Sequence, residues 1–232
     1  MSRRVPFSLC IFAAAVVLSG CFTGQRPHFN SDPFAQGVPT GDAAIDAVLY
    51  ELDAVTTGPA TAVYAVLTKF GNTPTSATVV LDRSRRAIEV GQVRYVDTGG
   101  EQFTCTIDAD TDAATDCTKG FNPARISDVG ITIEFYAAEA AKRLRRDAQA
   151  QLGPAVAHEE VIANQTATCV SVTVTGGTAI YCVLEDGLIA KLDDGDVLIT
   201  LGLLEPTVDA AKLHVASIGP RTVARELSPE ND

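Results

Sequence analysis

The chain has 232 residues, of which 46% are hydrophobic and 20% charged, and its formal net charge is −11. This composition is typical of a globular domain and excludes a disordered, collagen-like or multi-span membrane protein. The acidic balance argues against nucleic-acid binding, which usually requires a basic surface. The length favours one domain with a sizeable core.

Residues 1–20 are typical of a secretory signal peptide. Arg3 and Arg4 give a positive start, and the apolar run that follows is shorter than the roughly 20 residues that span a bilayer. The run ends in an aliphatic residue, two small residues and a cysteine: Leu18, Ser19, Gly20 and Cys21. This motif resembles the lipobox of bacterial lipoproteins, whose cysteine becomes the lipidated first residue. An uncleaved anchor and a plain signal peptide are the alternatives.

Cleavage before Cys21 removes two arginines and no acidic residue, so the net charge of −11 deepens to −13. Acylation of Cys21 gives a stable membrane anchor when two or more acyl chains are attached. We therefore expect an extracytoplasmic cell-envelope protein that is lipid-anchored to a bacterial membrane. Of the six cysteines, Cys10 leaves with the signal and Cys21 is acylated, so four remain in an oxidising compartment.

Residues 21–41 are expected to be the lipidated N-terminus and a flexible tether, because prolines and glycines alternate there without apolar periodicity. Residues 42–220 are expected to form a single α+β domain, and residues 221–232 a disordered tail. A helix capped by Asp42 is predicted, since apolar side chains follow it at helical spacing: Ile45, Val48, Leu49, Leu52 and Val55.

Strands are predicted after this helix. Residues 61–70 are apolar on both faces, which favours a central strand covered on both sides. Residues 76–82 form the next strand. Residues 86–96 are predicted as one strand with a β-bulge at Gly91, because the apolar residues change parity there. Residues 102–107 alternate cleanly and predict a further strand.

A second helix is predicted over residues 134–152, where Ala, Arg and Gln are frequent and Gly153-Pro154 follows. It carries a cluster of four basic side chains: Lys142, Arg143, Arg145 and Arg146. One interpretation is contact with anionic lipid headgroups. The simpler interpretation is a solvated face, supported by a pair between Glu139 and Arg143 at i, i+4 spacing.

Residues 168–204 predict a four-strand antiparallel meander, with hairpin turns at Asp186-Gly187 and Asp194-Gly195. A turn around Thr175-Gly176 places Cys169 directly opposite its partner across the first hairpin, within reach of a disulfide to Cys182.

The remaining two cysteines, Cys105 and Cys117, then pair by exclusion. Four free thiols or a metal site are the alternatives, but the spacing of the cysteines matches no zinc pattern.

Residues 108–116 begin like a calcium loop, with carboxylates at positions 1, 3, 5 and 9. Ala113 replaces the glycine of position 6 and Lys119 replaces the acid of position 12, so a solvated acidic hairpin is favoured over a calcium site. The chain has no Gly-x-Ser-x-Gly elbow and no phosphate-binding glycine loop. We therefore expect a non-enzyme without metal or cofactor.

The order of lipobox, tether, helix, curved strands, helical insertion and meander resembles the LolA/LprG-type lipoproteins over residues 43–218. The local sequences that carry the resemblance are the lipobox, the meander around Cys169 and Cys182, and Pro206-Thr207-Val208-Asp209. The resemblance implies an open half-barrel, mainly antiparallel, with helices packed on its concave face. It also implies an apolar cavity that holds acyl chains. The disulfides depart from the family, since many members have none.

Two functions are compatible with these observations. The first is binding or carriage of an apolar ligand, in particular a lipid, by a membrane-anchored lipoprotein. The second is a non-enzymatic interaction or structural role in the cell envelope, with a filled core. The alanines of the second helix allow either a void or close packing. A continuous apolar cavity of several hundred Å³ would separate the two functions.

Overall fold

The computed structural model describes residues 32–54, 58–120, 122, 138–150, 152–185 and 187–215. Several expected features lie outside the described residues, namely the signal peptide, the lipobox with Cys21, most of the tether, the start of the second helix and the tail. The chain divides into residues 1–33 and 34–232. The account below concerns the second unit.

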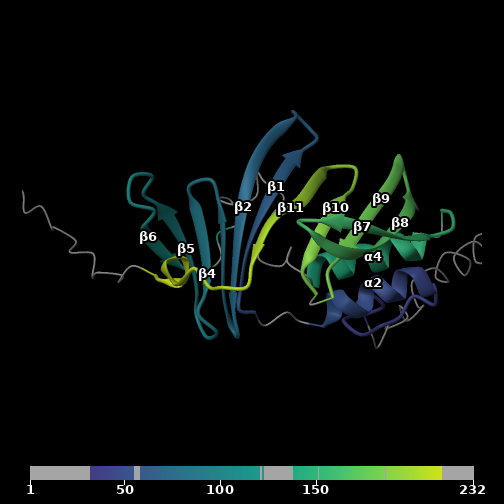
Figure 1. The fold of residues 1–232 in the computed structure, drawn as a ribbon, viewed down its shortest axis with the longest axis horizontal. Helices are drawn as coiled ribbons and strands as arrows, with labels where there is room; N and C mark the ends of the chain where they lie inside the picture. Colours follow the sequence, from purple (N-terminus) through teal and green to yellow (C-terminus); the bar gives the residue numbers. More distant parts are fainter. Residues whose placement is uncertain are drawn as a thin grey trace, which may run out of the picture. The chain divides into compact units, whose positions relative to one another are not determined.

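The described strands form one open antiparallel sheet of eleven strands, in the order β6-β5-β4-β3-β2-β1-β11-β10-β9-β8-β7 (Figure 1). The first half of the sheet contains β1 (Ala60–Thr68), β2 (Thr73–Asp82), β3 (Arg85–Val90), β4 (Val93–Asp97), β5 (Gln102–Ile107) and β6 (Ala114–Lys119). The second half contains β7 (Val156–Ile162), β8 (Gln165–Val174), β9 (Gly177–Val183), β10 (Ile189–Asp193) and β11 (Val197–Glu205). The predicted antiparallel α+β fold is confirmed.

The two halves of the sheet meet where β1 pairs with β11. Their register runs from Thr61 opposite Glu205 to Thr68 opposite Val197, and it shifts between Val63 and Tyr64. Gly202 is the extra residue at this shift, because Val63 lies opposite Leu203 and Tyr64 opposite Leu201. β1 is thus central, as predicted.

The prediction that this central strand is covered on both sides is wrong. Alternate residues of β1 are buried, including Ala62, Tyr64 and Val66, and they face the main core. On the opposite face Ala65 is exposed, and beyond the strand Phe70 is 93% exposed. A strand with an apolar sequence on both faces can therefore remain half-solvated when only one face carries a second layer.

The single strand predicted for residues 86–96 is also wrong, because this segment is a hairpin. β3 ends at Val90 and β4 begins at Val93, and these two residues lie opposite one another. Gly91 has a φ of 57° and occupies the two-residue turn, where a left-handed conformation favours glycine. A two-residue turn shifts side-chain parity along the sequence in the same way as a bulge, which explains the error.

The predicted C-terminal meander is confirmed and is longer by one strand. β8 pairs with β9 so that Cys169 lies opposite Cys182, as the register argument requires. β7 was not predicted, because its sequence contains the polar run His158-Glu159-Glu160. It pairs with β8 around Ala163 and Asn164, both of which have positive φ.

Two described α-helices lie on one face of the sheet (Figure 1). Helix α2 (Ala43–Asp53) begins where the Asp42 carboxylate accepts hydrogen bonds from the backbone N–H groups of Ala44 and Ile45, as predicted. Helix α4 (Ala138–Ala150) packs beside it, and both contact β8. We call the two helices the helix layer, and the sheet face toward them the inner face. None of the described helices has the length and apolar character needed to cross a bilayer.

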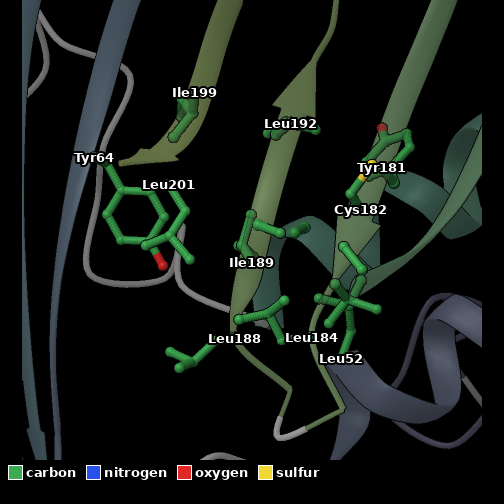
Figure 2. Close-up of a cluster of buried hydrophobic side chains, with 14 of the residues drawn as sticks. Leu52, Tyr64, Tyr181, Cys182, Leu184, Leu188, Ile189, Leu192, Ile199 and Leu201 are labelled. Carbon is green, nitrogen blue, oxygen red and sulfur yellow. The ribbon is translucent and has the colours of Figure 1, made fainter. Parts of the chain in front are cut away.

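The main core lies between the helix layer and the inner face and continues onto β1 and β11. Figure 2 shows part of this cluster, with Leu52 of α2 next to Leu184 and with Tyr64, Leu192 and Ile199 on strands farther from the helix. A smaller cluster lies on the opposite face, where Leu213 of the short helix η4 (Ala210–Leu213) packs against Val80 and Val96.

Both predicted disulfides are present. Cys105 bonds to Cys117 between β5 and the edge strand β6, and Cys169 bonds to Cys182 between β8 and β9. They close loops with sequence separations of 12 and 13 residues. In the chain-entropy treatment, a loop of this length stabilises the fold by about 3 kcal/mol.

The two bridges are expected to differ in their rate of reduction. Cys117 is half-buried on the edge strand β6, whereas Cys169 and Cys182 are buried. Attack on a disulfide requires access to a sulfur atom. Mild reduction of the folded protein followed by alkylation should therefore label Cys105 and Cys117 several-fold faster, as measured by peptide mass spectrometry. Faster labelling of Cys169 and Cys182 would contradict this assignment of exposure.

Candidate functional site

The two helices of the helix layer bury side chains of different size in the core. Helix α2 buries large aliphatic residues, namely Ile45, Val48, Leu49 and Leu52. Helix α4 buries two alanines, Ala140 and Ala141, beside Leu144. Small side chains bring the backbone of α4 close to its neighbours. The position expected for a ligand, between this helix and the sheet, is therefore occupied by close packing.

The layer is filled at its centre. Val48, Leu144 and Val170 expose none of their surface to a water-sized sphere. A side chain that lines a cavity large enough for an acyl chain must expose surface to that cavity, so no such cavity adjoins these three residues. The expected continuous cavity is absent from the part of the layer that they form.

Two hollows border the layer instead. The first has a volume of about 400 Å³ and lies between residues 37–39, the α2 side chains Leu49 and Tyr50, and Arg145. The second has a volume of about 300 Å³ and lies between the start of α2 and the end of α4. Ile45, Ala148 and Val172 line this second hollow, so it reaches apolar side chains of both helices and of β8.

Residues 36–41 form an ordered segment that we call the N-terminal strap. The side-chain amide of Gln36 donates to the Asp53 backbone oxygen at 2.7 Å, and the backbone N–H of Thr40 donates to the Asp46 carboxylate at 2.7 Å. Asp46 accepts from both the backbone and the hydroxyl of Thr40, which lowers its pKa despite the opposing effect of burial. The flexible tether expected over residues 21–41 therefore does not extend through residues 36–41.

Arg145 joins the strap to both helices. Its side chain is 3% exposed, its guanidinium pairs with the Asp53 carboxylate of α2, and its Nε donates to the Val38 backbone oxygen at 2.8 Å. Headgroup contact by Arg145 is therefore wrong, since its donors point into the layer. Arg143 pairs with Asp194. The other two basic residues of the cluster, Lys142 and Arg146, are exposed.

Asp147 lies at the second hollow and accepts a hydrogen bond from the Tyr181 hydroxyl at 2.6 Å. Burial raises the pKa of the Asp147 carboxyl, and the hydrogen bond from Tyr181 only partly opposes this effect. Burial also raises the pKa of Tyr181, and the adjacent carboxylate raises it further. Asp147 is thus a carboxyl with a raised pKa at the margin of the apolar layer. The sequence analysis did not single it out.

In the acidic hairpin between β5 and β6, carboxylates accept hydrogen bonds from other residues of the protein. Asp108 accepts from the side chain and backbone of Thr111, which lowers its pKa. Asp112 accepts from Lys212 at 2.9 Å and from Arg94 at 2.9 Å, and its pKa is lowered in consequence. Cationic side chains thus stand beside Asp112 where a calcium ion would be, which favours the hairpin interpretation.

One further group of ligand-type side chains gathers where His158 and Glu160 of β7 lie near Cys169 and Cys182. The two cysteines are joined in a disulfide, and the Glu160 carboxylate pairs with Lys191 at 3.1 Å. A disulfide offers no thiolate. These four residues therefore do not form a zinc site in the oxidised protein.

Comparisons with known proteins concern the fold alone. No family model matches the sequence, and no curated protein matches it. Among solved structures, MucB is similar with a TM-score of 0.46 and 13% identity, over 76% of this chain and 64% of that chain, which is less than two thirds of MucB. LprF from Mycobacterium bovis is similar with a TM-score of 0.38 and 12% identity, over 68% of this chain and 91% of that chain. MucB in complex with MucA(peri) is similar with a TM-score of 0.37 and 11% identity, over 75% of this chain and 60% of that chain.

Replacing Arg145 is expected to destabilise the domain strongly. Arg145→Met leaves the Asp53 carboxylate and the Val38 oxygen without their buried donor, and loss of one partner of a buried pair costs about 3–5 kcal/mol. The free energy of unfolding in urea measures this loss. Arg146→Met, one position along the same helix and exposed, should change it by less than about 0.5 kcal/mol. Equal effects of the two substitutions would contradict the structural role of Arg145.

Asp147 should make stability fall as pH rises. Its pKa is raised in the folded protein, so between its unfolded and folded pKa values the folded state binds more protons and stability decreases with increasing pH. Asp147→Asn removes this penalty while its side-chain oxygen still accepts from Tyr181. The variant should gain stability over the wild type at pH 7 and lose that gain at pH values where Asp147 is protonated, as measured by urea unfolding across pH. A difference independent of pH would overturn the assignment.

Proposed function

We propose that this chain is an extracytoplasmic lipoprotein, anchored through acylated Cys21, whose domain binds an apolar ligand of lipid type between the helix layer and the inner face. The role is binding, not catalysis. The anchor is supported by the motif Leu18-Ser19-Gly20-Cys21. An oxidising, extracytoplasmic compartment is supported by the two disulfides.

The observation that carries the ligand proposal is the second hollow. It opens at the margin of the layer and is lined by Ile45, Ala148 and Val172, which belong to the two helices and to the sheet. Polar side chains, namely those of Thr40, Asp42 and Asp147, line the same hollow, so an acyl chain that enters there meets both kinds of side chain. Each buried methylene contributes about 0.8 kcal/mol, so separation of α4 from the sheet by a long chain can be offset by burial of that chain.

The inner face provides the surface along which such a chain would lie. Its buried side chains form one apolar cluster from β8 to β4 through β1 and β11, including Val172, Tyr181, Ile199, Val66, Val79, Ile88 and Tyr95. The alanines of α4 add little bulk above this face. Outward movement of α4 would open an apolar space there, and it would also withdraw Leu144 and separate Arg145 from Asp53.

A second candidate function is favoured by the filled centre of the layer. Val48, Leu144 and Val170 are fully enclosed, as expected of a protein that interacts through its surface and has no internal ligand. In this alternative the chain is a non-enzymatic interaction or structural lipoprotein of the cell envelope.

Lipid that co-purifies with the protein decides between the two functions. The mature chain from Phe22 onward is secreted behind a cleavable signal without the lipobox cysteine, so that any lipid found is held non-covalently. We expect extraction and mass spectrometry to recover lipid in a defined ratio to protein. Ala148→Trp fills the second hollow and should lower that ratio several-fold.

The matched control is Ala150→Trp, because Ala150 is exposed on the same helix. This variant should retain the lipid content of the wild type. Circular dichroism and the presence of both disulfides check that each variant is folded. No lipid above the background of an unrelated secreted protein, with all three proteins folded, would refute ligand binding and support the filled-core alternative.

A further inference from the structure

Side chains that can bind a metal form a row across three neighbouring strands. His158 of β7 lies opposite Cys169 of β8, and Cys169 lies opposite Cys182 of β9. Side chains directly opposite one another in an antiparallel pair project to the same face of the sheet. Glu160 follows His158 by two positions on β7 and therefore shares that face. The strand register thus brings together an imidazole, a carboxylate and two sulfur atoms.

These four side chains are close enough to share one metal ion. One ring nitrogen of His158, one oxygen of Glu160 and the two sulfur atoms all lie within 4.8 Å of one another. A tetrahedral zinc ion, with Zn–S bonds of about 2.3 Å and Zn–N and Zn–O bonds of about 2.0 Å, holds its ligand atoms about 3.3–3.8 Å apart. Small side-chain rotations, made once the two sulfur atoms are no longer bonded to each other, would bring the four atoms to these separations.

The disulfide decides whether the sulfur atoms can bind a metal. Bonded to each other they offer no thiolate, whereas two separate thiolates are strong zinc ligands. A dithiol reductant transfers two electrons and two protons to the bridge, so that the S–S bond breaks, two thiols form and the reductant becomes a disulfide. Zinc then displaces the two thiol protons to water as two Zn–S bonds form. Oxidation by an external disulfide returns the two electrons to that oxidant and releases the zinc.

The surroundings of the four side chains suit such a site. Lys191, which lies opposite Cys182 on β10, donates to the two Glu160 carboxylate oxygens at 3.2 and 3.1 Å. A hydrogen bond of this kind orients a ligating carboxylate. Zinc bound by two thiolates, a carboxylate and a neutral imidazole carries one net negative charge, which the Lys191 ammonium balances. The Glu160 side chain is 40% exposed whereas both cysteines are buried, so a metal ion has an entry path from solvent to shielded sulfur ligands.

We infer that reduction of the Cys169–Cys182 bridge opens a zinc site formed by His158, Glu160, Cys169 and Cys182, and that oxidation of the two thiols releases the metal. Two thiolates among the four ligands favour zinc over hard cations such as Ca²⁺ and Mg²⁺, and the mixed set of sulfur, nitrogen and oxygen suits tetrahedral zinc. The inference depends neither on acylation of Cys21 nor on binding of an apolar ligand. The domain would take up zinc only where a dithiol reductant reaches it.

The test uses the secreted chain from Phe22 onward, which contains every residue that the structure describes. A phosphine, which competes less for zinc than a dithiol does, reduces both bridges and is then removed without admitting oxygen. Zinc binding is measured by competition with a chromophoric chelator. We expect one zinc ion per reduced chain and none per oxidised chain. Co²⁺ in place of zinc should give the visible absorption bands of a tetrahedral site with thiolate ligands.

Alkylation of the reduced protein identifies the cysteines that hold the metal. Zinc should slow the labelling of Cys169 and Cys182 several-fold, as measured by peptide mass spectrometry. Cys105 and Cys117 should label equally with and without zinc and serve as the internal control. Protection of Cys105 and Cys117 in place of the other pair would overturn the inference.

His158→Ala and Glu160→Ala each remove one ligand. Either substitution should lower the zinc affinity of the reduced protein at least about 100-fold, since loss of even an outer partner of a ligand costs roughly 10–100-fold. The matched controls are His214→Ala and Glu159→Ala, because both residues are exposed and neither belongs to the row. These controls should retain the wild-type affinity. Equal affinities in the ligand variants and the controls would refute the site.

Circular dichroism shows whether the reduced chain remains folded. If reduction unfolds it, zinc present during refolding should restore the native spectrum with one ion per chain, because a ligand that binds only the folded state stabilises that state. A folded, reduced protein that takes up no zinc refutes the inference. A reduced chain that stays unfolded in the presence of zinc refutes it as well, and the bridge then has a structural role alone.

Discussion

The pairing of β1 with β11 is the constraint on which the rest of the structure depends. β1 to β6 form one antiparallel meander and β7 to β11 form another, and the eight aligned pairs between Thr61 and Thr68 on one strand and Val197 and Glu205 on the other join them. The helix layer packs mainly on the second meander, on β7, β8 and β9. Without this seam the apolar inner face of β1 to β4 would lose its continuity with the core beneath the helices.

Ion pairs between residues remote in sequence hold the other elements of this acidic protein together. Arg145 binds the N-terminal strap and α2, which precede it by about a hundred positions. Arg94 and Lys212 bind Asp112 of the acidic hairpin and Glu89 of β3, so that η4 and the hairpin are held to one face of the sheet. Arg94, Arg145 and Lys212 thus connect segments that are remote from one another in the sequence.

Local signals in the sequence predicted those parts of the fold whose causes are local. The Asp42 cap and the apolar stripe define α2, and the Asp-Gly turns together with the valine alternation place Cys169 opposite Cys182. The errors arise where the cause is distant or ambiguous. Gly91 gives the same parity change in a hairpin as in a bulge. β7 is a polar edge strand defined by its neighbour, and Arg145 differs from Arg146 only through partners that are remote in sequence. The second hollow combines residues from four separate segments, so no local sequence motif predicts it.

The β1–β11 seam also has a consequence for how the protein reaches its native state. Its paired residues are 129 to 144 positions apart in the sequence. Non-local strand pairing of this kind forms slowly. A chain that is synthesised from its N-terminus presents β1 and β2 long before β11. Until β11 arrives, β1 is an unpaired edge with an apolar inner face, which is the kind of surface that recruits other chains. The second meander can assemble from contacts between neighbouring strands. Its strand β11 then pairs with β1 and covers the exposed edge.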